Sequence, residues 1–340
     1  MSATMQAAVV PALGAPLEIR EIPMPTPGPG QLLVRIEASG ICHTDVHAAR
    51  GDWPVKPSPP FVPGHEGIGT VVGVGAVGLD RRIGERVSIA WLGSACGRCR
   101  YCVSGRETLC ETQTNSGYSV DGAWAEYAVV DERFAVPVPD GVSSFDAAPL
   151  TCAGVTTFAA IENARVQPGE RVGVFGIGGL GHLAVQYARL VGGVVVGVDV
   201  ERSKLALATE LGADDVVDAR AEDPVAALRD LGGLDVAVAL AASPQSFAQA
   251  FASLRRGGRL VCVALPAGGT LPIPIFDTVL GGISVLGSIV GTRQDLADVF
   301  ALHAAGRTRV VAESRKLGDI NASIDEILAG RVAARLVVEF

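Results

Sequence analysis

The chain has 340 residues, of which 49% are hydrophobic and 19% are charged, and its formal net charge is -8. This length predicts two domains with full cores, and the composition excludes a largely disordered or fibrous chain. The negative charge disfavours nonspecific attraction to nucleic acid or acidic lipid, so we expect small molecules as partners.

No segment predicts a membrane span or an export signal. No run approaches the roughly 18 uninterrupted apolar residues that a spanning helix needs. Residues 1–16 lack the basic start and apolar run of a signal peptide. Reduced cysteines suit the cytosol, so we expect a cytoplasmic protein that does not contact membranes.

The chain changes character near its middle. Short β-like runs separated by Gly and Pro predict a β-rich region at residues 5–10, 17–22, 31–40, 67–75, 86–93 and 126–131. Beyond about residue 168, expected strands occupy 171–176, 194–199, 214–218, 234–240, 258–265 and 283–288. Helix-length segments between them lie at 181–192, 202–212, 223–232 and 243–257. This alternation predicts a parallel sheet covered on both faces. Residues 292–306 predict a further helix, and 334–340 a strand that rejoins the first region.

Four cysteines follow the spacing C-x2-C-x2-C-x7-C: Cys96, Cys99, Cys102 and Cys110. Four thiolates this close can surround one tetrahedral Zn²⁺, and because they fill every position the site would be structural. Buried free thiols and disulfides are the alternatives. An iron–sulfur cluster is a further alternative, but its ferredoxin-type spacing differs in the last interval and includes a proline. The spacing favours a structural zinc lobe at about residues 92–112.

A glycine-rich turn lies between an apolar strand and an amphipathic helix, at Gly176, Gly178, Gly179 and Gly181. Glycines let the backbone approach a pyrophosphate, and the following helix N-terminus offers free N–H groups. Asp199 ends the next strand, where a carboxylate accepts the ribose hydroxyls and favours NAD over NADP. Its alternative is a helix-capping aspartate. Lys204 is a second candidate for the ribose, or a solvated helix lysine.

The motifs GICHTDVH, PGHEGIG, the four-cysteine lobe, TCAGVT and GIGGLG occur in that order. In this the chain resembles the zinc-dependent alcohol dehydrogenases of the medium-chain dehydrogenase/reductase superfamily, most closely the bacterial and yeast type, over essentially its whole length. The resemblance implies an α/β protein: a doubly wound Rossmann NAD-binding domain at 153–290 and a mostly β, GroES-like catalytic domain. Residues 1–152, with the zinc lobe, and 291–340 would form the latter.

The resemblance also implies that Cys42, His65 and Cys152 hold a catalytic zinc. Two thiolates and one imidazole match a site that keeps its fourth position open for water or substrate. Glu66 is expected close to the metal, with a buried charge paired to an arginine as the alternative. Asp45 is expected to accept the other ring N–H of His65 and so fix the metal-binding tautomer.

Further roles follow from the same resemblance. Thr44 and His47 are expected to pass the alcohol proton to solvent, with simple surface exposure as the alternative for His47. His43 and Arg335 are expected at the cofactor pyrophosphate, or solvated.

Backbone groups of Ile289 and Val290 are expected at the nicotinamide carboxamide, although apolar packing also explains these residues. Trp53 and Trp91 are expected to narrow the substrate cleft, or to pack as ordinary hydrophobic side chains. Cys262 is expected to pack as a small buried hydrophobic side chain, and His182 and His303 are interpreted as structural or exposed.

Together these expectations describe an NAD-dependent enzyme with two zinc ions per chain that interconverts primary alcohols and aldehydes, as a homotetramer. A related zinc dehydrogenase acting on secondary alcohols, polyols or a specialised aldehyde is the alternative. A zinc-ribbon nucleic-acid binder is disfavoured by the acidic balance and the dinucleotide signature. A noncatalytic NAD-binding protein is disfavoured by the complete set of Cys42, His65, Cys152, Thr44 and His47.

Overall fold

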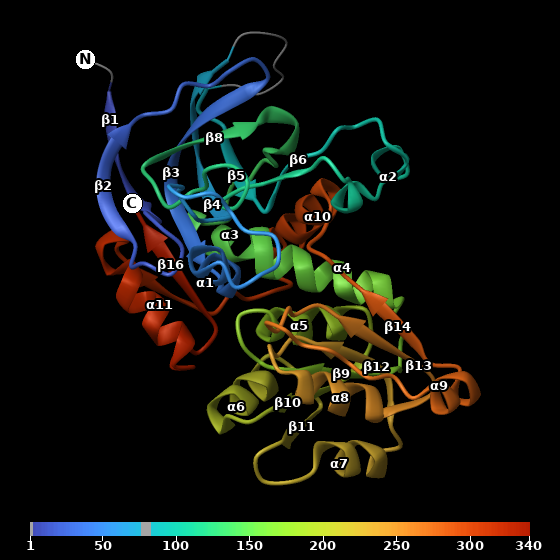
Figure 1. Ribbon diagram of the computed structural model, residues 1–340. Helices are drawn as coiled ribbons and strands as arrows, with labels where there is room; N and C mark the ends of the chain where they lie inside the picture. Colours follow the sequence, from blue (N-terminus) through green and yellow to red (C-terminus); the bar gives the residue numbers. More distant parts are fainter. Residues whose placement is uncertain (1–2, 76–82) are drawn as a thin grey trace. The chain divides into compact units, whose positions relative to one another are not determined.

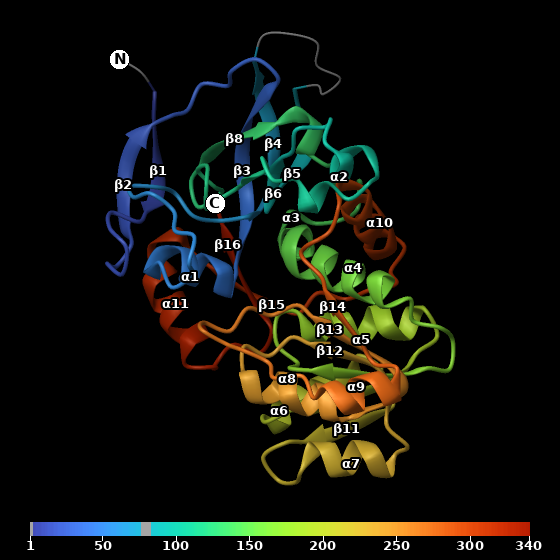
Figure 2. The same cartoon turned by 45° about the vertical axis from the view of Figure 1, so that its right-hand side comes forward.

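The computed structural model describes residues 3–75 and 83–340, and the described residues form two compact units. Unit 1 comprises Met1–Val155, Val290–Gly306 and Ala312–Phe340, and unit 2 comprises Thr156–Ile289 and Arg307–Val311. Figures 1 and 2 trace the chain through the elements named below.

Unit 1 is built on a sheet with the strand order β15-β16-β3-β4-β5, in which β8 also pairs with β3. Its strands are β3 (Gln31–Ile41), β4 (Glu66–Val74), β5 (Arg86–Ala90), β8 (Tyr127–Asp131), β15 (Ala312–Arg315) and β16 (Arg335–Glu339). A separate hairpin joins β1 (Thr4–Val9) to β2 (Glu18–Pro23), and β6 (Leu92–Ser94) pairs with β7 (Thr114–Asn115). The tail strand β16 lies antiparallel to β3, with Leu336 opposite Ile41.

Helices and single turns complete unit 1. The helices are α1 (His43–Arg50), α2 (Arg100–Val103), α3 (Ser144–Pro149), α4 (Val155–Ala164, most of which belongs to unit 2), α10 (Arg293–Ala304) and α11 (Ile320–Leu328). Short 3₁₀ turns span Glu107–Leu109, Glu132–Phe134 and Leu317–Asp319, and a π-helical turn spans Leu150–Gly154.

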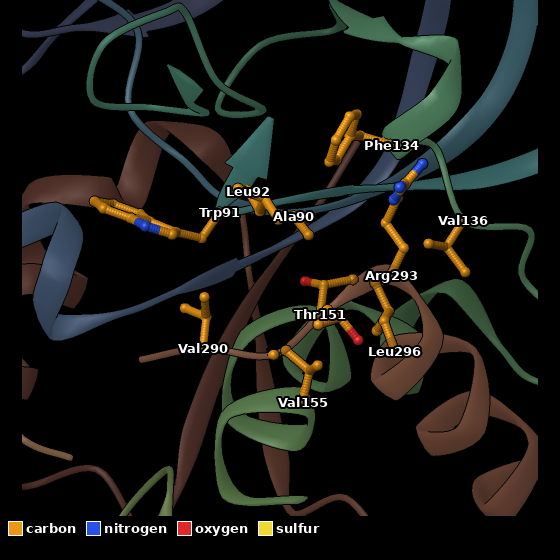
Figure 3. Close-up of a pocket in the computed structure, with 12 residues that line it drawn as sticks. Ala90, Trp91, Leu92, Phe134, Val136, Thr151, Val155, Val290, Arg293 and Leu296 are labelled. Carbon is orange, nitrogen blue, oxygen red and sulfur yellow. The ribbon is translucent and has the colours of Figure 1, made fainter. Parts of the chain in front are cut away.

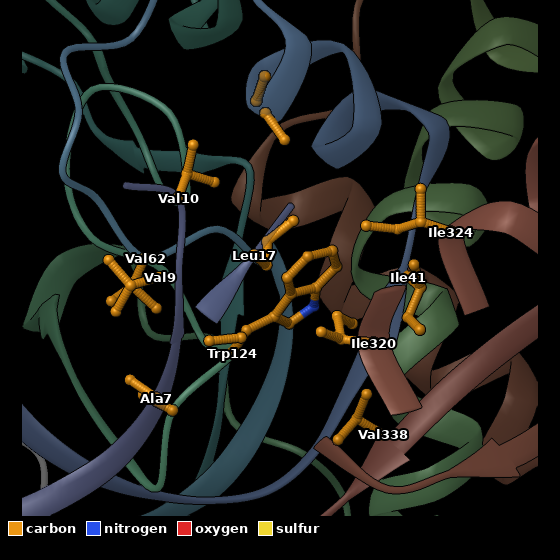
Figure 4. Close-up of a cluster of buried hydrophobic side chains, with 14 of the residues drawn as sticks. Ala7, Val9, Val10, Leu17, Ile41, Val62, Trp124, Ile320, Ile324 and Val338 are labelled. Atoms are coloured by element: carbon orange, nitrogen blue, oxygen red, sulfur yellow. The ribbon is translucent and has the colours of Figure 1, made fainter. Parts of the chain in front are cut away.

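The core of unit 1 surrounds Trp124, whose side chain is fully buried. Figure 4 shows its indole among Leu17, Ile320 and Ile41, which come from distant parts of the chain. The indole Nε1 donates to the Gly40 carbonyl at 3.1 Å, so burial leaves this polar group bonded. This packing fixes the end of β3, directly before Cys42.

Unit 2 is a parallel sheet with the strand order β11-β10-β9-β12-β13-β14. Its strands are β9 (Arg171–Phe175), β10 (Val194–Asp199), β11 (Asp215–Asp218), β12 (Leu234–Ala239), β13 (Leu254–Cys262) and β14 (Ser284–Gly287). The connecting helices are α5 (Gly181–Leu190), α6 (Arg202–Glu210), α7 (Pro224–Asp230), α8 (Pro244–Ala252) and α9 (Ile275–Gly281). The order reverses between β9 and β12, as in doubly wound folds that bind dinucleotides at this point.

Three expected segments were wrong in detail. The helix expected at 243–257 ends at Ala252, and the strand expected from 258 begins at Leu254. Leu254 pairs with Leu234 of β12, and the ladder overrides the helical pattern of the sequence. The strand expected at 86–93 breaks at Trp91 into β5 and β6.

Candidate active site

Cys42, His65 and Cys152 come from three separate elements of unit 1. Cys42 follows β3 and is the N-cap residue of α1, and His65 directly precedes β4. Cys152 lies in the π-helical turn between α3 and α4. Such turns are rare and occur often at functional sites. All three side chains are at least 93% buried, because their exposed fractions are 6%, 1% and 7%.

These side chains meet in one cluster. Single ligand atoms of Cys42, His65, Glu66 and Cys152 all lie within 4.8 Å of one another. The buried His65 Nε2 has no hydrogen-bond partner among the described residues. Leaving a buried imidazole nitrogen without a hydrogen bond costs folding free energy. A metal ion bound by this nitrogen and the two neighbouring thiols would satisfy it.

Asp45 organises this cluster from inside α1. One of its carboxylate oxygens accepts from the backbone N–H of Cys42 at 3.0 Å. The other accepts from the Gly64 N–H at 3.1 Å and lies 2.9 Å from His65 Nδ1. This arrangement places the imidazole proton on Nδ1 and leaves the Nε2 lone pair available to a cation.

The thiol and imidazole groups are electrostatically coupled. The hydrogen bond with Cys152 lowers the pKa of Cys42, helped by the charge of Arg335, while the same partner raises the pKa of Cys152. Burial opposes protonation of His65, but Asp45 raises its pKa above the usual value. A cation would therefore compete with protons at these atoms, as at metal sites in general.

Glu66 is completely buried and faces Arg335 of β16, with Oε1 at 3.1 Å from the guanidinium. Burial raises the pKa of Glu66 to about 8, although the positive charge of Arg335 acts in the opposite direction. Arg335 itself is only 5% exposed and also contacts the Ile41 carbonyl at 3.4 Å. The alternative that Arg335 is solvated was wrong, because Arg335 is buried and pairs with Glu66 inside unit 1.

The remaining residues of GICHTDVH lie on the more open side of α1. His43 is exposed and Thr44 and His47 are half-buried. His47 Nδ1 lies 3.0 Å from the Asp52 carboxylate, and its ring stacks on Trp53 with centroids 5.0 Å apart. Asp52 was not identified from the sequence, although it follows His47 by five residues in the same segment.

A small, mostly apolar pocket lies in unit 1 beside the cluster of Cys42, His65 and Cys152. Trp91, Thr151, Val155 and Val290 line one part of it, and Phe134 and Arg293 another (Figure 3). Trp91 also meets the His65 ring edge-on at 5.3 Å. Trp53 is not among the lining residues and instead contacts His47 and Tyr118. Sequence reasoning identified Trp91 and Val290 but missed Phe134 and Arg293, which carry no motif.

The four-cysteine lobe forms a second cluster, whose sulfur atoms lie within 4.8 Å of one another. All four thiols are free, so the disulfide alternative was wrong. Two S···S separations are 3.5 and 4.0 Å, close to the roughly 3.8 Å edge of a tetrahedron with Zn–S bonds of about 2.3 Å. Backbone N–H groups of Cys96, Cys99 and Cys102 point at sulfur at 3.3–3.5 Å, which favours thiolates. The lobe therefore fits a closed metal site.

The glycine-rich turn of unit 2 has the backbone that a dinucleotide site needs. Gly176 has φ +96, and a Cβ there would lie 2.9 Å from the Ala241 nitrogen. A Cβ on Gly181 would lie 2.0 Å from the Gly176 carbonyl, so helix and strand pack closely. Gly178 faces open space, which leaves room for a phosphate beside its backbone. Gly179 lies between them at the turn before α5.

Asp199 ends β10 beside this turn. Its carboxylate accepts from the backbone N–H of Ile177 at 2.7 Å, and also from Val200 and Glu201. The side chain is therefore held in place at the carboxyl edge of the sheet. Lys204 is half-buried in the first turn of α6, and Ile289 is 47% exposed.

Three histidine and cysteine residues lie outside these sites. His182 is fully buried in α5, where its Nδ1 lies 3.2 Å from the Gly178 carbonyl and its Nε2 accepts from Val311. Cys262 is half-buried at the end of β13, and His303 is half-buried in α10. Within residues 3–75 and 83–340, no helix is long and apolar enough to cross a bilayer.

Comparisons with known proteins agree with this geometry. The family model for the alcohol dehydrogenase GroES-like domain matches residues 28–140, and the zinc-binding dehydrogenase model matches 179–305. An alcohol dehydrogenase of Geobacillus stearothermophilus is 48% identical over 98% of this chain and 99% of its own.

Solved structures of related enzymes also resemble this chain over nearly its whole length. The alcohol dehydrogenase from the hyperthermophilic archaeon Aeropyrum pernix superposes with a TM-score of 0.92 at 34% identity, covering 98% of this chain and 100% of its own. Acetophenone reductase from Geotrichum candidum NBRC 4597, in complex with NAD, gives 0.89 at 30% identity over 100% and 98% of the two chains.

Fold and site thus define a zinc-binding dehydrogenase, with a GroES-like part and a Rossmann-type part. More narrowly, the chain belongs to the zinc-dependent alcohol dehydrogenases of the medium-chain dehydrogenase/reductase superfamily. The family and the fold predicted from the sequence are confirmed.

Proposed function

We propose that this alcohol dehydrogenase reversibly oxidises small primary alcohols to aldehydes with NAD, at a zinc ion held by Cys42, His65 and Cys152. The buried His65 Nε2 carries the proposal, because it lies beside two buried thiols without a partner among the described residues. Three protein ligands leave one position open, as in catalytic rather than structural zinc sites. The bulky Trp91 side chain lines the pocket beside this cluster, which favours small substrates.

The residues of unit 1 supply positioning and a proton path. When bound, zinc would acidify the alcohol hydroxyl and NAD would accept the hydride. Thr44 and His47 are the proposed path for the released proton, because a hydroxyl donates and accepts at once. Asp52 at His47 Nδ1 favours the proton on that nitrogen and leaves Nε2 to receive another.

Glu66 and Arg335 have a supporting role in this proposal. Arg335 supplies a buried positive charge beside the two thiols and Glu66. That charge favours the thiolate forms that zinc requires. Glu66 lies among the same ligand atoms, so it is placed to approach the metal.

NAD rather than NADP is the proposed cofactor because of Asp199. Its carboxylate would accept the ribose hydroxyls and repel a 2'-phosphate. The glycine turn at Gly176, Gly178, Gly179 and Gly181 would take the pyrophosphate. We also propose cofactor contacts for His43, Lys204 and Arg335, and for the backbone of Ile289 and Val290.

A steady-state panel tests this assignment. Wild-type enzyme is assayed with primary alcohols, a secondary alcohol and a polyol, each with NAD and NADP. We expect the highest kcat/KM with a primary alcohol and NAD. The variant Asp199→Ala should shift the NAD/NADP ratio toward NADP by about tenfold or more, while Asp215→Asn, an exposed acid on the neighbouring strand, should not. Turnover of no alcohol with either cofactor would refute the proposal.

We further propose a homotetramer. Strand β14 is at the edge of its sheet, and α9 beside it exposes Ile275, Phe276 and Val279 by 80%, 74% and 69%. Exposed apolar patches of this kind mark interaction sites, and an open strand edge can pair with a second copy. Light scattering should give four chains per particle, and Phe276→Asp should reduce that number. Val103→Asp, at an exposed apolar residue of the lobe, is the control.

A cytoplasmic location completes the proposal. It rests on the free thiols of both clusters, which a reducing compartment preserves. Cell fractionation with a soluble cytoplasmic marker tests it, and recovery with membranes or in the medium would contradict it.

A further inference from the structure

The four-cysteine lobe and the apolar pocket share a side chain. Phe134 lines the pocket, and it also packs in a buried cluster with Leu92, Ala95 and Cys110. The other three cysteines of the lobe pack against this cluster. A change in the shape of the lobe therefore reaches one wall of the pocket directly, because well-packed cores transmit displacement.

An ion pair between the buried Glu107 carboxylate and the partly exposed Arg293 guanidinium provides a second connection. Glu107 lies in the lobe, three residues before Cys110, and Arg293 lines the pocket at the start of α10. The Arg293 Nε donates to both Glu107 oxygens at 3.0 and 3.1 Å, and its Nη2 donates to one of them at 2.6 Å. The Arg293 backbone N–H also donates to Glu107 at 3.0 Å. The guanidinium lies 4.3 Å above the Phe134 ring.

The turn that this ion pair anchors forms the opposite wall of the pocket. Val290 lines the pocket with φ +41, a left-handed conformation that is rare for a β-branched residue. A Cβ on Gly291 would lie 2.5 Å from the Val155 side chain, so the turn is closely packed. Such backbone persists only where the surroundings hold it. Glu107 holds it from the lobe, through Arg293.

From these contacts we propose that Glu107 and Arg293 are positioning residues that make the shape of the substrate pocket depend on the metal of the four-cysteine lobe. The lobe would then set substrate affinity in addition to stabilising the fold. This proposal rests on the proposed function for its substrate. Because coupling between two sites is reciprocal, an alcohol in the pocket must also stabilise the metal in the lobe.

The first test measures metal binding in the lobe and does not depend on catalytic turnover. The holoenzyme is loaded with Co²⁺, whose thiolate absorption grows with the number of sulfur ligands and so separates the lobe from the Cys42 site. The metal is then titrated to equilibrium against a chelator with and without saturating 1-pentanol. The alcohol should tighten metal binding in the lobe about fivefold in the wild type. It should have no effect in Glu107→Gln.

The second test is kinetic. Glu107→Gln and Arg293→Lys should each raise KM for 1-pentanol about tenfold, with kcat changed less than about twofold. The double variant should be no worse than either single variant, because both remove one interaction. The matched control is Glu111→Gln, an exposed acid of the same lobe, which should leave KM and the metal affinity of the lobe unchanged.

Three results would overturn the proposal: 1-pentanol fails to tighten metal binding in the lobe of the wild type, it still tightens binding in Glu107→Gln, or Glu111→Gln has the same effect as Glu107→Gln. Circular dichroism of each variant shows whether it is folded. If Glu107→Gln is unfolded, Arg293→Lys decides the outcome. An enzyme that oxidises no alcohol refutes the proposed function instead, whereas an active enzyme with uncoupled sites refutes only this inference.

Discussion

The two sulfur-rich clusters of unit 1 are built in opposite ways. The lobe gathers Cys96, Cys99, Cys102 and Cys110 from one short loop, and three of its sulfurs accept from backbone N–H groups of the same loop. The cluster at Cys42 joins residues up to 110 positions apart and is buried, and its imidazole Nε2 has no hydrogen-bond partner in the part of the chain that the structure describes. A local, sulfur-only set suits a closed structural site, whereas a mixed set assembled by the fold suits an open one.

This contrast predicts that losing a ligand has different consequences at the two clusters. Cys152→Ser should lower kcat/KM at least about a thousandfold, because the metal supplies several kcal/mol of transition-state stabilisation. Metal analysis should still find the lobe zinc, at one ion per chain. Cys262→Ser, at a half-buried thiol outside both clusters, is the control. Nearly normal activity in Cys152→Ser would show that the two clusters do not differ in function.

Loss of a lobe ligand should act first on stability. Cys102→Ser should lower the free energy of unfolding by about 3–5 kcal/mol, because a structural metal contributes its binding energy to folding. Chemical denaturation of the wild type and variant, each with full metal at the Cys42 site, measures this difference. An unchanged unfolding midpoint would mean that the lobe holds no metal.

The support given by Asp45 sharpens the comparison, because the lobe has no equivalent carboxylate in its described contacts. Asp45→Asn should weaken metal binding at the Cys42 cluster by about 10–100-fold, since the amide removes the negative charge beside the His65 ring. Competition with a chelator gives the affinity at each cluster separately. Equal weakening at both clusters would contradict a local role for Asp45.

The smallest expected effect is the pH dependence of the stability that the Glu107–Arg293 ion pair contributes. Burial opposes ionisation of Glu107, but hydrogen bonds from Arg293 hold its pKa below the usual value. The stability from this pair is therefore complete above the unfolded pKa of about 4.3 and is lost as pH falls through the lower folded value. Glu107→Gln should cost about 1–2 kcal/mol at pH 7 and progressively less in acid. Unfolding free energies of both proteins between pH 7 and pH 3.5 measure this, and a constant difference would exclude the ion pair as its source.

The sequence was sufficient wherever chemistry is local. The C-x2-C-x2-C spacing places its sulfurs together in any loop conformation that binds metal, and the glycine turn is recognisable between its strand and helix. The parallel order of unit 2 followed from alternating strands and helices.

Other features depend on contacts that no pattern carries. Glu66 can pair with Arg335 because β16 lies against β3. These two strands begin some 300 residues apart in the sequence. Only contacts in the folded structure identify four further residues of the site and its surroundings: Asp52, Phe134, Glu107 and Arg293. Nothing in the amphipathic 243–257 segment reveals that Leu254 joins the sheet. The domain boundaries near 152 and 290 stay predictions.

Anomalous diffraction at the zinc edge, from crystals of the enzyme purified without added metal, tests the central claim most directly. We predict one peak within about 2.0–2.3 Å of Cys42 Sγ, His65 Nε2 and Cys152 Sγ, and a second inside the four-cysteine lobe. A peak in the lobe alone, from an enzyme that oxidises alcohols at full rate, would contradict the account.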